Sequence, residues 1–162
     1  MTQSLADRIF HFAYVVPDLH AALSFFREAM GVPKFLVKED VTLQDQTYLG
    51  QPADLHQSIA FGFVGPVEIE LIQPLSGVSS YSEYLKKTPG GGIQHLGILV
   101  DDYDTGVTEM QAKGFNLVQT GRNGETRFGY FDTDRAMGTL TEIVYRAPKE
   151  REMFERMKRG EL

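Results

Sequence analysis

Two histidines and two glutamates lie in the interiors of otherwise apolar segments of this 162-residue chain. They are His11 in residues 8–16, Glu70 in residues 67–73, His95 in residues 93–100 and Glu142 in residues 138–145. Burying an isolated carboxylate is costly unless it is paired or bound to a metal. Two imidazoles and two carboxylates make a mixed nitrogen and oxygen site that suits Zn, Ni, Co, Mn or Fe(II). The four side chains are therefore candidate ligands of one divalent metal ion, with the remaining positions open to water and substrate.

An internal repeat places the four candidates at equivalent positions in the two halves of the chain. Two alignments define it: residues 10–18 with residues 94–102, and residues 67–72 with residues 139–144. The first alignment superposes His11 on His95, and the second places Glu70 opposite Glu142. The alternative is that both glutamates face solvent on an exposed sheet face while core carbonyl groups satisfy both histidines. That alternative needs four coincidences at duplicated positions, so the repeat favours a shared metal site.

The segment around His95 also predicts the shape of the site. Strand alternation sends His95 and Gly97 to one face of the sheet, and Gln94 and Leu96 to the other. Because Gly97 has no side chain, we expect it to leave space for a substrate beside the imidazole.

The composition excludes several kinds of chemistry and partner. There is no cysteine, which rules out disulfides, thiolate nucleophiles and thiolate metal ligands. The net charge of -6 and the scattered basic residues argue against nucleic acid as a partner. No apolar run is long enough to cross a bilayer, and residues 1–10 lack the basic start and apolar centre of a signal peptide. We therefore expect no membrane partner and a cytoplasmic location.

The elements that must position the candidate ligands form two β-α-β-β-β modules. The predicted divisions are a first module at residues 8–75, a linker with a short helix at residues 76–92, a second module at residues 93–146 and a C-terminal helix at residues 147–162. Each module begins with a histidine-bearing strand, which is followed by an acidic N-cap and a helix that a glycine closes. The predicted fold class is α+β, with the two tandem modules forming a single domain.

Some local patterns are less regular. Residues 35–48 are compatible with one strand and a polar turn, and residues 50–54 are compatible with a loop. In the first helix, both Phe25 and Phe26 are expected in the core.

A tail helix from residue 148 to about residue 159 has its apolar residues on one side: Met153, Phe154 and Met157. We expect this side to pack on the outside of the domain or on a second subunit, and the protein to be a homodimer.

The most specific motifs are four short segments that carry the candidate ligands. They are the His11 strand ending in Val16-Pro-Asp18, Glu70-Leu-Ile-Gln-Pro74, Gly92-Ile-Gln-His95 with the later Val100-Asp-Asp102, and Gly138-Thr-Leu-Thr-Glu142. Over residues 8–146 the pattern resembles the vicinal-oxygen-chelate superfamily, which includes glyoxalases, extradiol dioxygenases and bleomycin-resistance proteins. Within it, the methylmalonyl-CoA epimerases look most similar. The resemblance implies an open half-barrel sheet around a central metal cavity, with these metal ligands: His11, Glu70, His95 and Glu142.

The resemblance also implies a type of reaction. A divalent ion in such a site offsets the negative charge that forms on a carbonyl oxygen when a neighbouring proton is removed. We therefore expect an isomerase or lyase of the glyoxalase and epimerase type, acting on a small carbonyl or thioester substrate. Glu142 is the first candidate for the base, Glu70 the second, and His56 at the pocket mouth a third.

Two other functions remain open at this point. An Fe(II) extradiol-type dioxygenase needs two histidines and one carboxylate plus open positions for oxygen, so the filled Glu70 position counts against it. A non-catalytic small-molecule binding protein of the bleomycin-resistance type has no evident reason to retain four ligands.

Two residues on adjacent faces of one predicted strand, Tyr130 and Arg127, are candidates for substrate contact. Thr139 and Thr141 are expected to pack.

Overall fold

The structure is a computed structural model, which describes residues 4–162. The strands are β1 (Ile9–Val15), β2 (Phe35–Thr42), β3 (Gln44–Tyr48), β4 (Gln51–Pro52), β5 (His56–Val64), β6 (Val67–Ser76), β7 (Gly92–Val100), β8 (Leu117–Asn123), β9 (Thr126–Phe131) and β10 (Leu140–Tyr145). The helices are α1 (Leu19–Glu28), α2 (Ser80–Lys87), α3 (Tyr103–Ala112), α4 (Asp134–Met137) and α5 (Pro148–Lys158), and a 3-10 turn η1 (Ala6–Arg8) precedes β1. None of these helices is long and apolar enough to cross a membrane.

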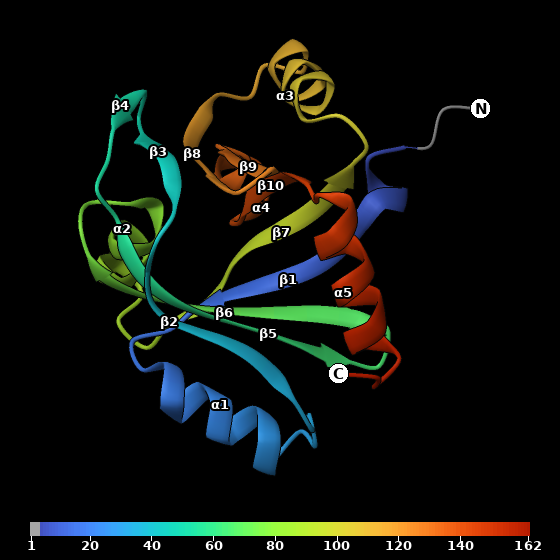
Figure 1. Ribbon diagram of the computed structural model, residues 1–162. Helices are drawn as coiled ribbons and strands as arrows, with labels where there is room; N and C mark the ends of the chain where they lie inside the picture. The colour runs from blue at the N-terminus through green and yellow to red at the C-terminus, as the bar shows by residue number, and fades with distance from the viewer. Residues whose placement is uncertain (1–3) are drawn as a thin grey trace.

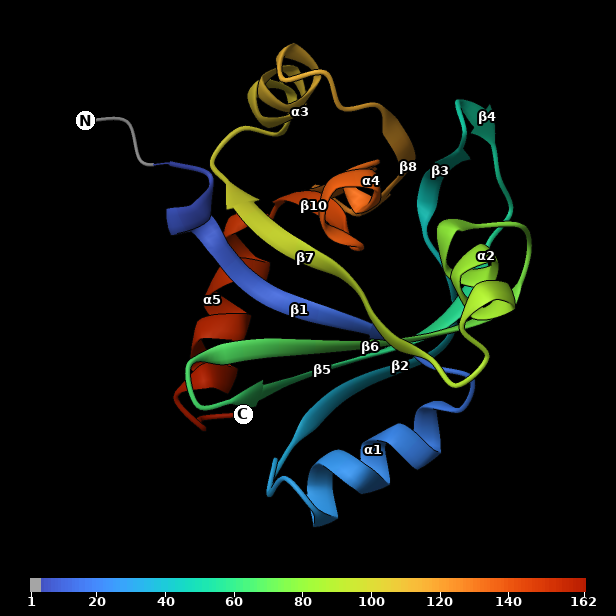
Figure 2. The ribbon, with the colours of Figure 1, turned by 180° about the vertical axis from the view of Figure 1, so that it is seen from behind.

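The strands form one ten-stranded sheet in the order β2-β5-β6-β1-β7-β10-β9-β8-β3-β4. It curls around a central space, with α1 and α3 on its outside (Figures 1 and 2). The two halves of the sheet have equivalent strand orders outward from its centre: β1, β6, β5 and β2 in one half correspond to β7, β10, β9 and β8 in the other. The predicted α+β half-barrel is therefore confirmed, and its symmetry supports the proposed modules on either side of residues 76–92.

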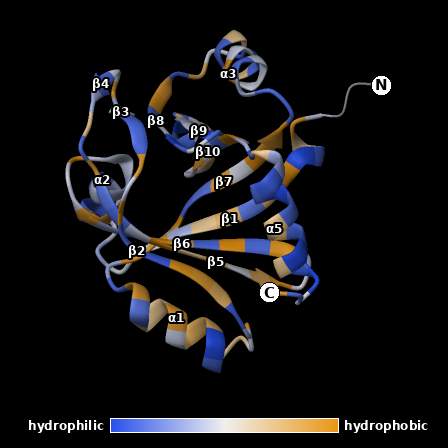
Figure 3. Ribbon diagram, in the orientation of Figure 1, coloured by the Kyte–Doolittle hydropathy of each residue, from blue (hydrophilic) through white to orange (hydrophobic). Residues whose placement is uncertain are grey.

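Capped amphipathic helices cover the convex face of each half. The carboxylates of Asp18 and Asp102 accept hydrogen bonds from backbone N–H groups in the first turns of α1 and α3. In α1, residues Leu19, Leu23 and Phe26 form the buried stripe. Strand β6 alternates between polar and apolar residues, so that one face can pack under α1 and the other can face the barrel (Figure 3).

The expectation that Phe25 lies in the core is wrong, because this side chain is 56% exposed. Successive helix residues differ by about 100° around the axis, so Phe25 lies about 100° or more from each member of the stripe made by positions 19, 23 and 26. Phe26, by contrast, is buried as expected.

The connection after β2 is the largest local departure from the sequence prediction. Residues 35–48 form two strands rather than one: β2 ends at Thr42, and after Leu43 strand β3 pairs with β8 in the other half of the sheet. The segment predicted as a loop contains β4, which pairs back on β3. Asp40 and Asp45 have positive φ angles and a register irregularity interrupts β2, which allows the chain to change direction here.

The C-terminal helix α5 is part of the domain wall. It runs beside the ends of β5 and β6 after leaving β10 (Figures 1 and 2). Phe154 is buried and its ring meets the ring of Phe61 on β5 edge-on, with 5.1 Å between centroids. Met153 and Met157 are only partly buried. The short helix α4 before β10 was not predicted from the sequence.

Candidate metal centre

The four central strands place the predicted ligands in two adjacent rows across the sheet. Read from β6 through β1 and β7 to β10, one row is Glu68, His11, Gly97 and Glu142. The next row is Glu70, Ala13, His95 and Leu140. Side chains in both rows face the interior of the half-barrel, because residues two apart on a strand share a face.

The structure brings all four predicted ligand residues together. One ligand atom from each of them lies within 4.8 Å of the others, and the side chains are between 0% and 8% exposed. His11 Nε2 lies 3.0 Å from Glu142 Oε2 and 3.7 Å from Glu70 Oε2. His95 Nε2 lies 3.5 Å from each of the same two carboxylate oxygens. Both imidazoles therefore direct Nε2 at the same pair of glutamates.

A bulge in the sheet precedes each histidine. Between β1 and β7 the register shifts so that Phe10 has no partner residue on β7, and Gln94 has none on β1. As a result, the residue before each histidine does not point cleanly to the opposite face. The side chain of Gln94 reaches the His95 ring, with 2.7 Å between Oε1 and Nδ1, whereas simple alternation predicts that the two side chains diverge.

The sequence interpretation of Gly97 is also wrong. A Cβ atom at this position would overlap the His11 ring, including a distance of 2.6 Å to Cδ2. Gly97 therefore accommodates the imidazole of the opposing strand, and the space beside it is not available to a substrate.

Gly97→Ala is expected to displace the His11 ring and destabilise the fold by about 1–3 kcal/mol, the usual cost of overpacking a core. Divalent-metal binding should weaken with it, because a ligand atom moves. Isothermal titration with Co²⁺ and urea unfolding measure the two effects. Gly90→Ala is the matched control, since a Cβ there meets nothing within 4 Å. Wild-type affinity in Gly97→Ala would contradict the assigned role.

The electrostatics of the metal-free cluster follow from its two carboxylates. Burial alone lowers the pKa of His11, but contacts with Glu142 and Glu68 outweigh it and raise the pKa from 6.5 to about 10. Burial is likewise outweighed at His95, whose pKa is raised by the contacts with Glu142 and Glu70. The same contacts lower the pKa of Glu142, against the effect of its burial. Without a metal, protons on the imidazoles balance the buried negative charge.

These shifts predict how the stability of the metal-free protein depends on pH. His11 binds its proton more tightly in the folded state, so its stabilising contribution is complete below pH 6.5 and is lost as pH rises through about 10. Urea unfolding of chelator-treated protein between pH 6.5 and pH 10 should therefore give a falling free energy of unfolding. In His11→Gln the fall should be smaller, and His20→Gln, at an exposed residue, should behave as wild type. A rise over this range in wild type would contradict the assignment.

Buried atoms without hydrogen bonds at the centre support a metal site. Among the described residues, the buried side-chain atoms without a hydrogen bond include His11 Nε2, His95 Nε2 and Glu142 Oε2. Buried polar atoms in native proteins normally have a partner. Nitrogen and carboxylate-oxygen atoms that converge without hydrogen bonds fit a divalent cation of the first transition row or Zn²⁺.

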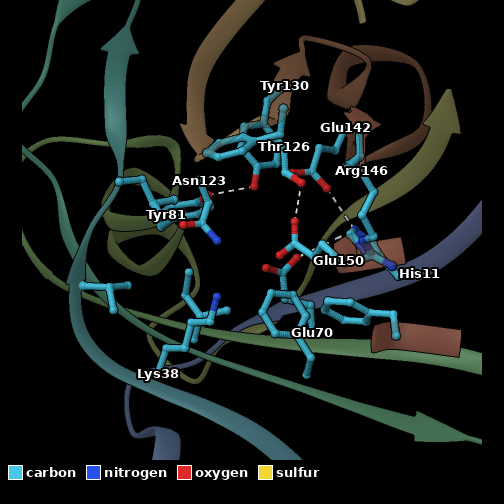
Figure 4. A pocket seen from close by; sticks show the side chains of 17 residues that line it. His11, Lys38, Glu70, Tyr81, Asn123, Thr126, Tyr130, Glu142, Arg146 and Glu150 are labelled. Carbon is cyan, nitrogen blue, oxygen red and sulfur yellow. Dashed lines mark hydrogen bonds and ion pairs between the residues drawn. The ribbon is translucent and has the colours of Figure 1, made fainter. Parts of the chain in front are cut away.

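A cavity opens from the cluster toward β2, β9 and α5. The free space in and in front of it, open solvent included, is about 640 Å³, and its lining is mostly apolar. An apolar lining with a few convergent polar groups is typical of a small-molecule site. The polar side chains that project into it with the glutamates include Lys38, Asn123 and Glu150 (Figure 4).

Two tyrosines form the innermost part of the cavity wall. The hydroxyl oxygens of Tyr81 and Tyr130 are 2.7 Å apart (Figure 4). The Tyr130 ring also lies 4.7 Å from the His95 ring. Burial raises the pKa of both phenols well above 10, so both stay protonated at neutral pH. Tyr130 was a candidate for substrate contact, and the structure places it in the cavity. Tyr81, on α2, was not among the candidates for substrate contact.

The remaining sequence candidates lie away from the cavity. Arg127 pairs with Asp104, with 3.0 Å between Nη2 and Oδ1, and its guanidinium covers the Tyr103 ring. His56 is 39% exposed and contacts Asp40 through Nδ1 at 2.9 Å. Neither side chain is among those that line the cavity.

The two threonines beside Glu142 differ in their surroundings. Thr141 packs as expected, and its hydroxyl lies 2.8 Å from the Thr133 hydroxyl. The hydroxyl oxygen of Thr139 is buried without a hydrogen-bond partner among the described residues, although the residue as a whole is only partly buried.

A half-barrel of two β-α-β-β-β repeats, with a histidine and a glutamate from each repeat at one centre, defines the vicinal-oxygen-chelate class of fold. The chain belongs to the superfamily described as glyoxalase/bleomycin resistance protein/dioxygenase, whose sequence model matches residues 10–131.

Relatives in this superfamily include named epimerases. The mitochondrial methylmalonyl-CoA epimerase of Mus musculus is 32% identical over 106 residues, which are 65% of this chain and 53% of the relative. The ethylmalonyl-CoA/methylmalonyl-CoA epimerase of Cereibacter sphaeroides is 29% identical over 117 residues, 72% of this chain and 78% of the relative. The chain thus spans about half the length of the mammalian relatives it matches.

Solved structures share the fold. The crystal structure of methylmalonyl-CoA epimerase from Mycobacterium tuberculosis gives a TM-score of 0.65 at 24% identity and covers 92% of this chain and 94% of that one. A methylmalonyl-CoA epimerase in complex with methylmalonyl-CoA and NH4+ gives 0.62 at 22% identity, covering 88% and 96%.

Proposed function

We propose that the protein is a divalent-metal-dependent epimerase that moves the proton next to the carbonyl of a small acyl thioester. The observation that carries the proposal is the convergence of two imidazoles and two carboxylates, with unpartnered atoms, at the end of an apolar cavity. Relatives that are named epimerases of acyl-CoA thioesters support this substrate class.

Four side chains would hold the ion: His11, Glu70, His95 and Glu142. A divalent ion supplies positive charge that offsets an oxyanion as it develops on the thioester carbonyl. Glu142 is the proposed base and Glu70 the second candidate, since both carboxylates line the cavity. The buried phenols of Tyr81 and Tyr130 keep water from this end of the cavity and can donate one hydrogen bond outward, because only one of the pair donates to the other.

The mouth of the cavity offers polar groups for the rest of the substrate. Lys38 has no ion-pair partner within 4 Å among the described residues, so its ammonium group is available to an anionic substrate group. Asn123 adds an amide at the same mouth. We propose that an acyl thioester with an acidic substituent fits this arrangement better than an uncharged carbonyl compound.

Hydrogen exchange in deuterated water tests the proposal. Metal-loaded protein is incubated with a panel of α-carbonyl thioesters and hemithioacetals, and incorporation of deuterium next to the carbonyl is followed by mass spectrometry. Exchange that depends on both protein and metal supports the epimerase. Absence of exchange across the panel would favour a non-catalytic binding protein, and oxygen consumption with catechols would favour a dioxygenase.

Three expectations from the sequence concern the whole protein and remain proposals: its oligomeric state, its compartment and its partner. We propose that the chain acts as a homodimer in the cytoplasm with a small-molecule substrate as its partner. The partly buried Met153 and Met157 on α5 are available to a second subunit. Relatives named as mitochondrial show that the compartment is not common to the whole family.

A further inference from the structure

A buried ion pair lies directly behind one of the proposed metal ligands. Glu68 on β6 accepts two hydrogen bonds from Arg146, at 2.8 Å and 3.0 Å, in a bidentate arrangement. The two side chains are only 3% and 8% exposed. Glu68 Oε1 also lies 3.7 Å from Nδ1 of His11, the ring nitrogen that faces away from the other ligands. Glu68 therefore stands between a buried guanidinium and the His11 ring.

The ring nitrogen next to Glu68 has no other partner. Among the described residues, His11 Nδ1 makes no hydrogen bond. Glu68 neighbours His11 directly across the β1 and β6 pairing, which fixes the separation of the two side chains. When a histidine binds a metal through one nitrogen, the other nitrogen usually donates its N–H to a carboxylate or carbonyl oxygen. Glu68 is the carboxylate within 4 Å of this nitrogen, and an approach of about 0.5 Å from its present 3.7 Å would let it accept the N–H.

Helix α5 holds the far side of the pair. The Arg146 guanidinium lies 3.7 Å from the centroid of the Phe154 ring and 4.9 Å from that of Phe10. Thr126 anchors the start of the helix by hydrogen bonding to Glu150 and accepting from the backbone N–H of Ala147. Contacts thus run without interruption from the helix to the His11 ring.

The internal repeat shows that this pair is not a duplicated feature. In the alignment of the two halves, Leu140 stands opposite Glu68 and Pro74 opposite Arg146. At the second histidine a neutral amide takes the equivalent place, because His95 Nδ1 meets Gln94 Oε1. A charged partner is therefore specific to the His11 side.

We infer that Glu68 and Arg146 are positioning residues that hold the His11 ring with Nε2 toward the ion, and that α5 sets the strength of metal binding through them. The inference rests on the proposed metal centre. Glu68 orients the ring and increases its basicity, while Arg146 keeps the carboxylate in place. Neither residue supplies a ligand atom to the ion. Loss of such a partner typically weakens metal binding about 10- to 100-fold.

Titration with Co²⁺, read by visible absorption and by competition with a chelator, tests the inference. Removing one partner alone leaves a buried charge uncompensated and threatens folding. The main variant is therefore the double substitution Glu68→Leu with Arg146→Met, which removes both charges while keeping apolar volume. Glu68→Gln is measured beside it, and Leu23→Ala, on the buried face of α1, is the control for general loss of stability.

The expected result is a 10- to 100-fold weaker Co²⁺ affinity and an altered Co²⁺ spectrum in the double variant, with both unchanged in Leu23→Ala. Wild-type affinity and spectrum in a folded double variant would overturn the inference, even if His11→Ala binds no Co²⁺. If wild type itself binds no Co²⁺, Zn²⁺ or Mn²⁺, the proposed metal centre fails first. The two failures are therefore distinguishable.

Discussion

His95→Ala is expected to abolish stoichiometric metal binding. His95 is 0% exposed, and its Nε2 lies 3.5 Å from both candidate carboxylates, so no solvent-exposed group can take its place without opening the sheet. Losing a ligand should weaken binding by more than the 10- to 100-fold that follows loss of an outer partner. Elemental analysis of purified protein should find about one divalent ion per wild-type chain and only a trace in the variant.

The matched control is His56→Ala, because His56 is a histidine of the same domain outside the cavity. It should retain the wild-type metal content. Equal metal content in wild type and His95→Ala would contradict the proposed metal centre. Circular dichroism of both variants establishes whether the fold survives, since truncating a fully buried ring also leaves a cavity.

The proximity of the four candidate ligands could be predicted because each breaks a local rule. Imidazoles and carboxylates are unfavourable inside apolar strands, and here the rule is broken at repeated positions. The repeat predicted two similar modules, whereas the half-barrel was implied by the resemblance to the vicinal-oxygen-chelate superfamily. Roles as ligands and base stay predictions until metal and exchange are measured.

The bulges next to the histidines could not be predicted in the same way. They depend on how β1 pairs with β7, which lies more than 70 residues further along the chain. The sequence of either strand alone does not predict that one of its residues stays unpaired. The assignment that assumed perfect alternation therefore failed at Gln94, and the interpretation of Gly97 failed because the ring of His11, on the paired strand, occupies the space beside it. The partner of a strand is likewise a tertiary choice, so β3 could not be assigned to β8 from its own residues.

Glu68 was overlooked although the sequence carried a clue. It stands two residues before Glu70, so strand alternation places both on the same face. Comparison of the two halves does not identify Glu68, because its counterpart in the second half is Leu140. A residue that shares a face with a candidate ligand, yet is absent from the repeat, is therefore informative about what distinguishes the two halves.

The two carboxylates of the centre are equivalent in the repeat but differ in their neighbours. Glu142 Oε2 approaches His11 Nε2 to 3.0 Å and has no hydrogen bond, whereas the nearest approach of Glu70 Oε2 to either imidazole is 3.5 Å. Both line the cavity, so either could accept a substrate proton. Separating their roles requires variants that keep shape and oxygen ligation while losing basicity.

Glu142→Gln is expected to lower the rate of deuterium exchange next to a thioester carbonyl by about 10²- to 10⁴-fold, the usual contribution of a positioned general base. Glutamine has nearly the same shape and retains an oxygen, so the cavity is preserved, but an amide cannot accept the proton. Glu70→Gln is the matched variant, and rates are compared at equal metal content. A large fall in Glu70→Gln with exchange retained in Glu142→Gln would make Glu70 the base. Retained exchange in both variants would exclude both carboxylates, because neither amide can carry the proton between substrate and water.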